Sequence, residues 1–230
     1  MGFVPVVLAV LLSLGCVLSA RFFLGAYSEE NFIKAFWLKG AAAVFFVAVG
    51  AVLLCVKGMT VYTGLTLGGL ILGLLGDQLL AMRLIHRCYH DLFFTVGAAS
   101  FAVGHFLYMV ALHNTGAVKI FVVLPVLFAA MLISYVYGKK NGTDFGEKTI
   151  TAVAYICVVL LMASVAICVA VRTVSVAGFL FALGGILFSV SDNILCAYCY
   201  GKKPVWKMNR DLHIAYYGAQ LAIAWSILFA

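Results

Sequence analysis

The chain has 230 residues, of which 66% are hydrophobic and 10% charged, and its formal net charge is +7. Soluble domains are about half apolar and a quarter charged, so this composition excludes a soluble globular enzyme, a disordered chain and a secreted disulfide scaffold. The positive charge does not indicate a nucleic acid partner, because Lys and Arg in a membrane protein mostly report the orientation of its loops.

Charged and turn-forming clusters divide the chain into eight apolar segments. A spanning helix needs about 20 apolar residues, so these segments nearly fill a single transmembrane domain over residues 1–230. The first segment lacks a positive N-terminal region and a convincing cleavage site before Arg21, and we therefore expect a span there instead of a signal peptide. The predicted spans of this all-α membrane bundle are 3–24, 36–56, 60–82, 90–112, 118–137, 149–171, 175–199 and 212–229.

The loops between these spans differ strongly in basic charge. The side of loops one, three, five and seven, counted with the adjoining span ends, holds 12 of the 15 Lys and Arg residues. The positive-inside rule makes that side cytoplasmic and places both termini on the other side. The sequence does not distinguish a bacterial inner membrane from the endoplasmic reticulum, and it does not fix the oligomeric state.

The seven cysteines are interpreted as free thiols, most of them within apolar segments. Cys196 and Cys199 form a CxxC pair. No second pair and no His cluster accompanies them, so we predict no zinc or redox site there. The sequence implies no metal and no cofactor.

A weak internal repeat appears when the chain is shifted by 115 residues. GLILGLLGDQLL at 69–80 then aligns with GGILFSVSDNIL at 184–195, and five of the twelve positions are identical, including Asp77 over Asp192. A duplication of four spans would make the halves parallel repeats about an axis along the membrane normal. Leu and Gly also match by chance in so hydrophobic a chain, so duplication and coincidence both remain open.

Ionisable residues inside spans mark candidate functional sites, because charge is expensive to place in a bilayer. Asp77 lies in the third span, His105 in the fourth and Asp192 in the seventh. At 1.5 Å per residue, Asp77 lies roughly 9 Å and Asp192 roughly 15 Å below the cytoplasmic boundary. Gln220 in the eighth span has about the same depth as Asp192, so we expect Gln220 and the two carboxylates in the cytoplasmic half of the bundle. His105 is expected to lie deeper, near or beyond the midplane.

Helical spacing places the polar residues on small-residue or aromatic faces. Gly69, Gly73 and Gly76 share a stripe with Asp77, and small residues let a neighbouring helix approach. Two further faces are formed by Gly97, Gly104, His105 and Tyr108 in the fourth span and by His213, Tyr216, Tyr217 and Gln220 in the eighth.

Each polar residue also has a purely structural interpretation. The aspartates can link helices, although two matched carboxyls are costly to keep for packing alone. His105 can be a neutral imidazole bonded to another helix, and the tyrosines and amide of the eighth span can be interhelical contacts. Lys39 and Asp91 lie near span ends, where we expect their side chains to reach the interface.

Two buried carboxyl groups permit two kinds of function. One can act as a general acid while the other acts as a general base, which suits cleavage of acetal-like or enol-ether bonds. A proton-coupled transporter of a small molecule or lipid can use the same pair to load and unload a proton. The chain has no GxSxG, HExxH or phosphate-binding glycine motif.

The chain resembles the YhhN-like lysoplasmalogenases at four motifs in order. These are LLGDQLL around Asp77, FAVGHFLYMVAL around His105, LFSVSDNIL around Asp192 and IAYYGAQLAIA around Tyr216, Tyr217 and Gln220. Lys39 at the start of the second span also fits, although the family often has Pro shortly after this Lys and this chain has Gly40.

The resemblance implies an eight-span membrane enzyme that hydrolyses the vinyl-ether bond of a lysoplasmalogen, which is a lysophospholipid, to a fatty aldehyde and a glycerophospho-base. It places the family's essential acidic pair on Asp77 and Asp192. We expect one aspartate to protonate the vinyl ether and the other to orient water. The substrate-binding residues we expect are Lys39, His105, Tyr108, Asn193, Tyr216, Tyr217 and Gln220.

Overall fold

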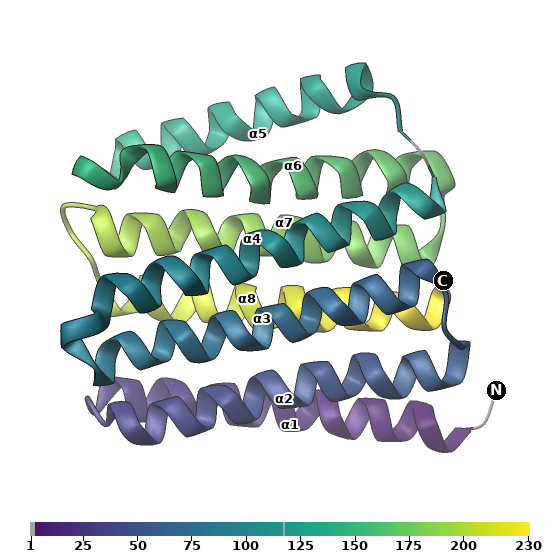
Figure 1. Cartoon of the computed structure of the whole chain (residues 1–230), viewed down its shortest axis with the longest axis horizontal. Coiled ribbons are helices and arrows are strands. Elements are labelled where there is room, and N and C mark those ends of the chain that lie inside the picture. Colours follow the sequence, from purple (N-terminus) through teal and green to yellow (C-terminus); the bar gives the residue numbers. More distant parts are fainter. Residues whose placement is uncertain (1–2, 117) are drawn as a thin grey trace. The chain divides into compact units, whose positions relative to one another are not determined.

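The computed structural model describes residues 3–116 and 118–230, which form eight long α-helices and no strand (Figure 1). The helices are α1 (Phe3–Ser28), α2 (Phe32–Lys57), α3 (Val61–Ile85), α4 (His90–Thr115), α5 (Ile120–Asn141), α6 (Thr149–Thr173), α7 (Val176–Tyr200) and α8 (Trp206–Ser226). Short 3₁₀ turns are η1 (Arg87–Tyr89), η2 (Gly146–Lys148) and η3 (Ile227–Phe229). All eight helices are long and apolar enough to cross a membrane, which confirms the predicted all-α polytopic class.

The helices extend past most ends of the predicted spans. The largest difference lies at α8, which begins at Trp206, whereas the predicted span begins at residue 212. Lys207 and Arg210 interrupt the apolar segment but not the helix, because Lys and Arg are good helix formers. Hydropathy therefore located the spans, while the helices continue beyond the apolar segments.

Side-chain caps fix the starts of α3 and α7. Thr60 Oγ1 accepts a hydrogen bond from the Thr63 N–H at 3.1 Å, and Thr63 Oγ1 accepts one from the Thr60 N–H at 2.8 Å. Ser175 Oγ accepts from the Gly178 N–H at 3.1 Å. The two caps are 115 residues apart, and so are the bounds of α3 and α7. This agreement supports the duplication suggested by the sequence repeat.

The chain divides into two compact units. The first consists of residues up to Ala111 together with Ala224–Ala230, and the second is Leu112–Ile223. The first unit therefore contains α1, α2, α3 and most of α4. The second contains α5, α6, α7 and most of α8.

Glycines on α3 allow α4 to lie close within the first unit. A Cβ atom on Gly69 would collide with the Tyr108 ring, and one on Gly76 would lie 2.6 Å from the Phe101 ring. The Ser100 hydroxyl donates to the Leu72 carbonyl at 2.7 Å across the same contact. The small-residue stripe predicted on α3 is thus confirmed as a packing face.

The C-terminal residues belong to the first unit through two side-chain contacts. Trp225 Nε1 donates to Ser13 Oγ of α1 at 3.0 Å. The hydroxyls of Ser226 and Tyr62 on α3 lie 2.6 Å apart. Both bonds join polar side chains that are buried or partly buried, where polar groups are nearly always hydrogen-bonded.

In the second unit, α6 and α7 lie side by side (Figure 1). Gly185 of α7 faces α6, since a Cβ atom there would lie 3.1 Å from the Ala163 Cα, and Gly184 faces Ile223 of α8. The loop after α5 is hydrogen-bonded to the end of α7. The Asp144 N–H of this loop donates to the carbonyl of Tyr200, the last residue of α7, at 3.0 Å. This contact fixes the loop after α5 against the end of α7.

Candidate functional site

Asp77 forms a buried ion pair with Lys39. The Lys39 Nζ of α2 lies 3.0 Å from the Asp77 Oδ1 of α3, and the side chains are 9% and 2% exposed. Our expectation that Lys39 reaches the interface is wrong. Helix α2 begins at Phe32, about two turns earlier, so Lys39 lies within the helix and its ammonium turns to the carboxylate of α3. Asp91, by contrast, is exposed as expected and lies 3.3 Å from His90 Nδ1.

Gly40 leaves room for Gln78 beside this ion pair. A Cβ atom on Gly40 would lie 3.0 Å from the Gln78 Nε2. That nitrogen is buried and has no hydrogen-bond partner among the residues that the structure describes. The contact between α2 and α3 therefore carries an ammonium, a carboxylate and an amide within a few residues.

His105 and Tyr108 lie on α4 in the same unit. They are 1% and 2% exposed, and their ring centroids are 6.0 Å apart. Tyr108 packs over Gly69 of α3. The buried face predicted for the fourth span is confirmed.

Asp192 is held by a tyrosine instead of a lysine. The Tyr155 hydroxyl of α6 donates to the Asp192 Oδ2 of α7 at 2.7 Å, and Asp192 is 6% exposed. Within the described part of the chain, no Lys, Arg or His forms an ion pair with Asp192. Sequence reasoning missed Tyr155, because a lone tyrosine near the end of an apolar span is typical of the membrane interface.

Asn193 bonds α7 to α5. Its Oδ1 accepts a hydrogen bond from the Ser134 hydroxyl of α5 at 2.5 Å, and its Nδ2 donates to the Ser189 carbonyl at 2.8 Å. The adjacent residues Asp192 and Asn193 thus bind α6 and α5, respectively. Ser134 was not predicted either, since an isolated serine in a span gives no local signal.

The aromatic face of α8 is buried as predicted. Gln220 Nε2 donates to the Tyr216 hydroxyl at 2.9 Å. The Tyr216 ring lies edge-on to Phe188 of α7, with centroids 5.4 Å apart, and Tyr217 stacks on His213 at 6.4 Å. The face consists of His213, Tyr216, Tyr217 and Gln220, whose side chains are at most 9% exposed.

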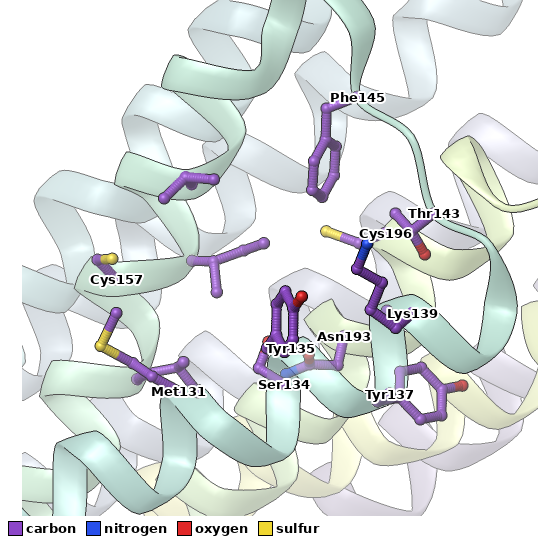
Figure 2. A pocket seen from close by; sticks show the side chains of 14 residues that line it. Met131, Ser134, Tyr135, Tyr137, Lys139, Thr143, Phe145, Cys157, Asn193 and Cys196 are labelled. Atoms are coloured by element: carbon purple, nitrogen blue, oxygen red, sulfur yellow. Dashed lines mark hydrogen bonds between the residues drawn. The ribbon is translucent and has the colours of Figure 1, made fainter.

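A cavity of about 310 Å³ lies among α5, α6, α7 and the loop after α5 in the second unit (Figure 2). Its walls are mainly apolar, and its polar groups include Ser134, Lys139, Thr143 and Asn193. Cys157 and Cys196 also line it and are free thiols. The sequence did not predict this cavity, apart from naming Asn193 as a binding residue. Nowhere in the described residues do three or more His, Cys, Asp or Glu side chains form a group that could hold a metal ion.

The model of the YhhN family matches residues 35–227 of the chain. The chain belongs to the YhhN family. The match extends over every predicted site residue, from Lys39 to Gln220. Comparisons with curated proteins and with solved structures gave no match. Family and fold together describe a multi-pass membrane protein with eight helices that can span the bilayer.

The predicted site residues of this YhhN protein fall into two groups. Those of the first unit are Lys39, Asp77, His105 and Tyr108, and those of the second are Asp192, Asn193, Tyr216, Tyr217 and Gln220. In each group, a side chain of the preceding helix contacts the aspartate. Lys39 of α2 contacts Asp77 of α3, and Tyr155 of α6 contacts Asp192 of α7. Asp77 has a cationic partner, and a contact between an ammonium and a carboxyl group is charge-assisted. Asp192 has a neutral partner, and a phenol can donate to either form of a carboxyl group.

Proposed function

We propose that this YhhN protein is a membrane hydrolase of the lysoplasmalogenase type. Its substrate would be a lysophospholipid with a vinyl-ether chain, and its products a fatty aldehyde and a glycerophospho-base. The observation that carries the proposal is the presence of two buried carboxyls at matching positions of α3 and α7 with unlike partners. Family membership agrees with this reaction class.

The unlike partners suggest different roles for the two aspartates. Asp192, bonded to a phenol, is the proposed proton donor to the vinyl carbon that is not bonded to oxygen. Asp77, paired with the Lys39 ammonium, is the proposed carboxylate that orients water toward the oxocarbenium carbon. Water adds there and gives up a proton, the resulting hemiacetal breaks to aldehyde and alcohol, and the donor carboxyl regains its proton.

The remaining candidate residues have supporting roles in this proposal. Lys39 positions Asp77 through the 3.0 Å ion pair. His105, Tyr108 and Asn193 are proposed to bind the polar part of the substrate. The Tyr216, Tyr217 and Gln220 side chains of α8 are proposed to do the same.

The direct test is aldehyde release from lysoplasmenylcholine by the purified protein in lipid nanodiscs, measured by mass spectrometry. The matched control substrate is the saturated alkyl-ether analogue, which has no double bond to protonate and stays intact. Asp77→Asn and Asp192→Asn should each lower the rate by about 10²-fold or more, the usual contribution of a general acid or base. Full activity in both variants would contradict the proposal.

The same substrate and mass spectrometric analysis, applied to the protein in sealed proteoliposomes, separate a hydrolase from a proton-coupled transporter. A transporter moves its substrate across a proteoliposome membrane without producing a new chemical species. Unchanged lysoplasmenylcholine together with proton-dependent flux would therefore replace the hydrolase proposal.

A further inference from the structure

The cavity of the second unit has an apolar body with polar groups toward one end. Met131 of α5 and Val153, Ile156 and Leu160 of α6 contribute apolar side chains. The polar end lies where α5 finishes, at Lys139 and Thr143. A volume of about 310 Å³ is within the range of small-ligand sites, and an apolar wall with a few polar groups is typical of them.

Lys139 brings a positive charge to the cavity. Its Nζ lies 5.7 Å from the centroid of the Tyr135 ring one turn earlier on α5. In Figure 2 its side chain extends from α5 toward the space near Cys196 and Phe145. An ammonium over an aromatic ring keeps its hydrogens available to an anion on the other side.

Thr143 contributes a hydroxyl that lacks a partner. Its Oγ1 is buried, and no residue that the structure describes forms a hydrogen bond with it. Buried polar groups in folded proteins are nearly always bonded. A ligand oxygen in the cavity would supply the missing partner.

A second lysine lies at the same end. The Lys202 N–H donates to the Asn141 carbonyl at 3.2 Å, and a Cβ atom on Gly142 would lie 2.8 Å from the Lys202 Cδ. The Lys202 side chain therefore crosses the αL turn that ends α5, directly before Thr143. The nearby Asp144 carboxylate is exposed and accepts a bond from the Gly146 N–H at 3.0 Å.

We propose that this cavity binds a single-chain amphiphile with an anionic head group. Its hydrocarbon chain would lie among Met131, Ile156 and Leu160, and its anionic oxygens would contact Lys139 and Thr143. A carboxylate and a phosphate monoester share this chemistry. The site lies wholly within the second unit and does not depend on the proposed hydrolysis.

Photolabelling tests the site without any catalytic readout. The purified protein in phosphatidylcholine nanodiscs is irradiated with three diazirine-bearing chains of equal length: a fatty acid, an alkyl phosphate and an uncharged fatty alcohol. Peptide mass spectrometry should find adducts on residues of α5, α6 and α7 that line the cavity. The anionic probes should label about tenfold more than the alcohol, as expected for one strong charged contact. The fatty acid and alkyl phosphate arms then show which head group is preferred.

Matched variants locate the head group. Lys139→Gln should reduce labelling by the anionic probes by about tenfold. Lys140→Gln removes the neighbouring exposed charge, which does not line the cavity, and should leave labelling unchanged. Thr143→Val keeps the shape but removes the hydroxyl and should also weaken labelling. Equal labelling by the alcohol, or no effect of Lys139→Gln, would overturn the proposal.

Two cysteines provide an independent measurement in the same protein. Cys157 and Cys196 line the cavity, whereas the exposed Cys55 lies on α2 in the first unit. Palmitate or dodecyl phosphate should slow reaction of Cys157 and Cys196 with a small apolar maleimide and leave Cys55 unaffected. Protection of all three thiols alike, or of none, would contradict a ligand in this cavity. If Cys157 and Cys196 are protected but the purified protein releases no aldehyde from lysoplasmenylcholine, the result contradicts the proposed hydrolase and leaves the binding site supported.

Discussion

The Lys39 Nζ lies 3.0 Å from the Asp77 Oδ1, and both side chains are shielded from solvent. An ion pair removed from water gains little net stability, but removal of one partner leaves the other charge buried and uncompensated. The pair therefore makes each residue depend on the other. It also ties α2 to α3 at the predicted catalytic position.

Lys39→Met should destabilise the protein strongly, because the Asp77 carboxylate loses its counter-charge. Breaking one side of a buried pair costs about 3–5 kcal/mol, and the melting temperature in detergent should fall accordingly. Lys34→Met, an exposed position on the same helix, is the control and should melt close to the native protein. Equal melting temperatures for the two variants would contradict a structural role for the pair.

Tyr155→Phe should reduce both stability and activity by removing the donor to Asp192. The hydrogen bond is 2.7 Å long, and leaving a buried acceptor without its donor costs about 1–3 kcal/mol. Aldehyde release in the assay above should fall, while substrate binding is preserved. Tyr198→Phe on α7 is the matched control, since no hydrogen bond of the Tyr198 hydroxyl is found in the described structure. A Tyr155→Phe variant with native rate and melting temperature would show that this bond is dispensable.

Sequence patterns predicted the features that depend on local periodicity. The eight helices follow from hydropathy, and the buried stripe of Gly69, Gly73 and Gly76 follows from the 3.6-residue repeat. The same holds for the buried face with Tyr216 and Gln220 on α8. Each signal lies within one helix, so no knowledge of helix neighbours was needed.

Features that depend on which helices pack together escaped prediction. Lys39 was expected at the interface because the apolar segment begins near it, but the helix begins earlier and α3 offers a carboxylate. Tyr155 and Ser134 became recognisable only through Asp192 and Asn193 on a neighbouring helix. The cavity has no sequence signature, since it arises where side chains of three helices leave space.

Gly69→Ala should destabilise the first unit although alanine favours helix. The added Cβ would meet the Tyr108 ring, and overpacking of this kind costs about 1–3 kcal/mol. Gly25→Ala on α1 is the control, because nothing lies within 4 Å of a Cβ there and helix propensity favours Ala by about 1 kcal/mol. In thermal unfolding, the melting temperature of Gly25→Ala should be equal to or higher than that of the native protein, and that of Gly69→Ala should be lower. A second change, Tyr108→Leu, should recover part of the loss by removing the ring.

The double variant Lys39→Met with Asp77→Leu separates the structural role of the ion pair from the catalytic role proposed for Asp77. Replacing a whole buried pair by apolar side chains of similar size is often neutral or stabilising, so the double variant should melt well above Lys39→Met. Aldehyde release should nevertheless stay at least about 10²-fold below the native rate, because the carboxylate that orients water is gone. Recovery of activity together with stability would instead make Asp77 a helix link, and Asp192 would then be the carboxyl left to support catalysis.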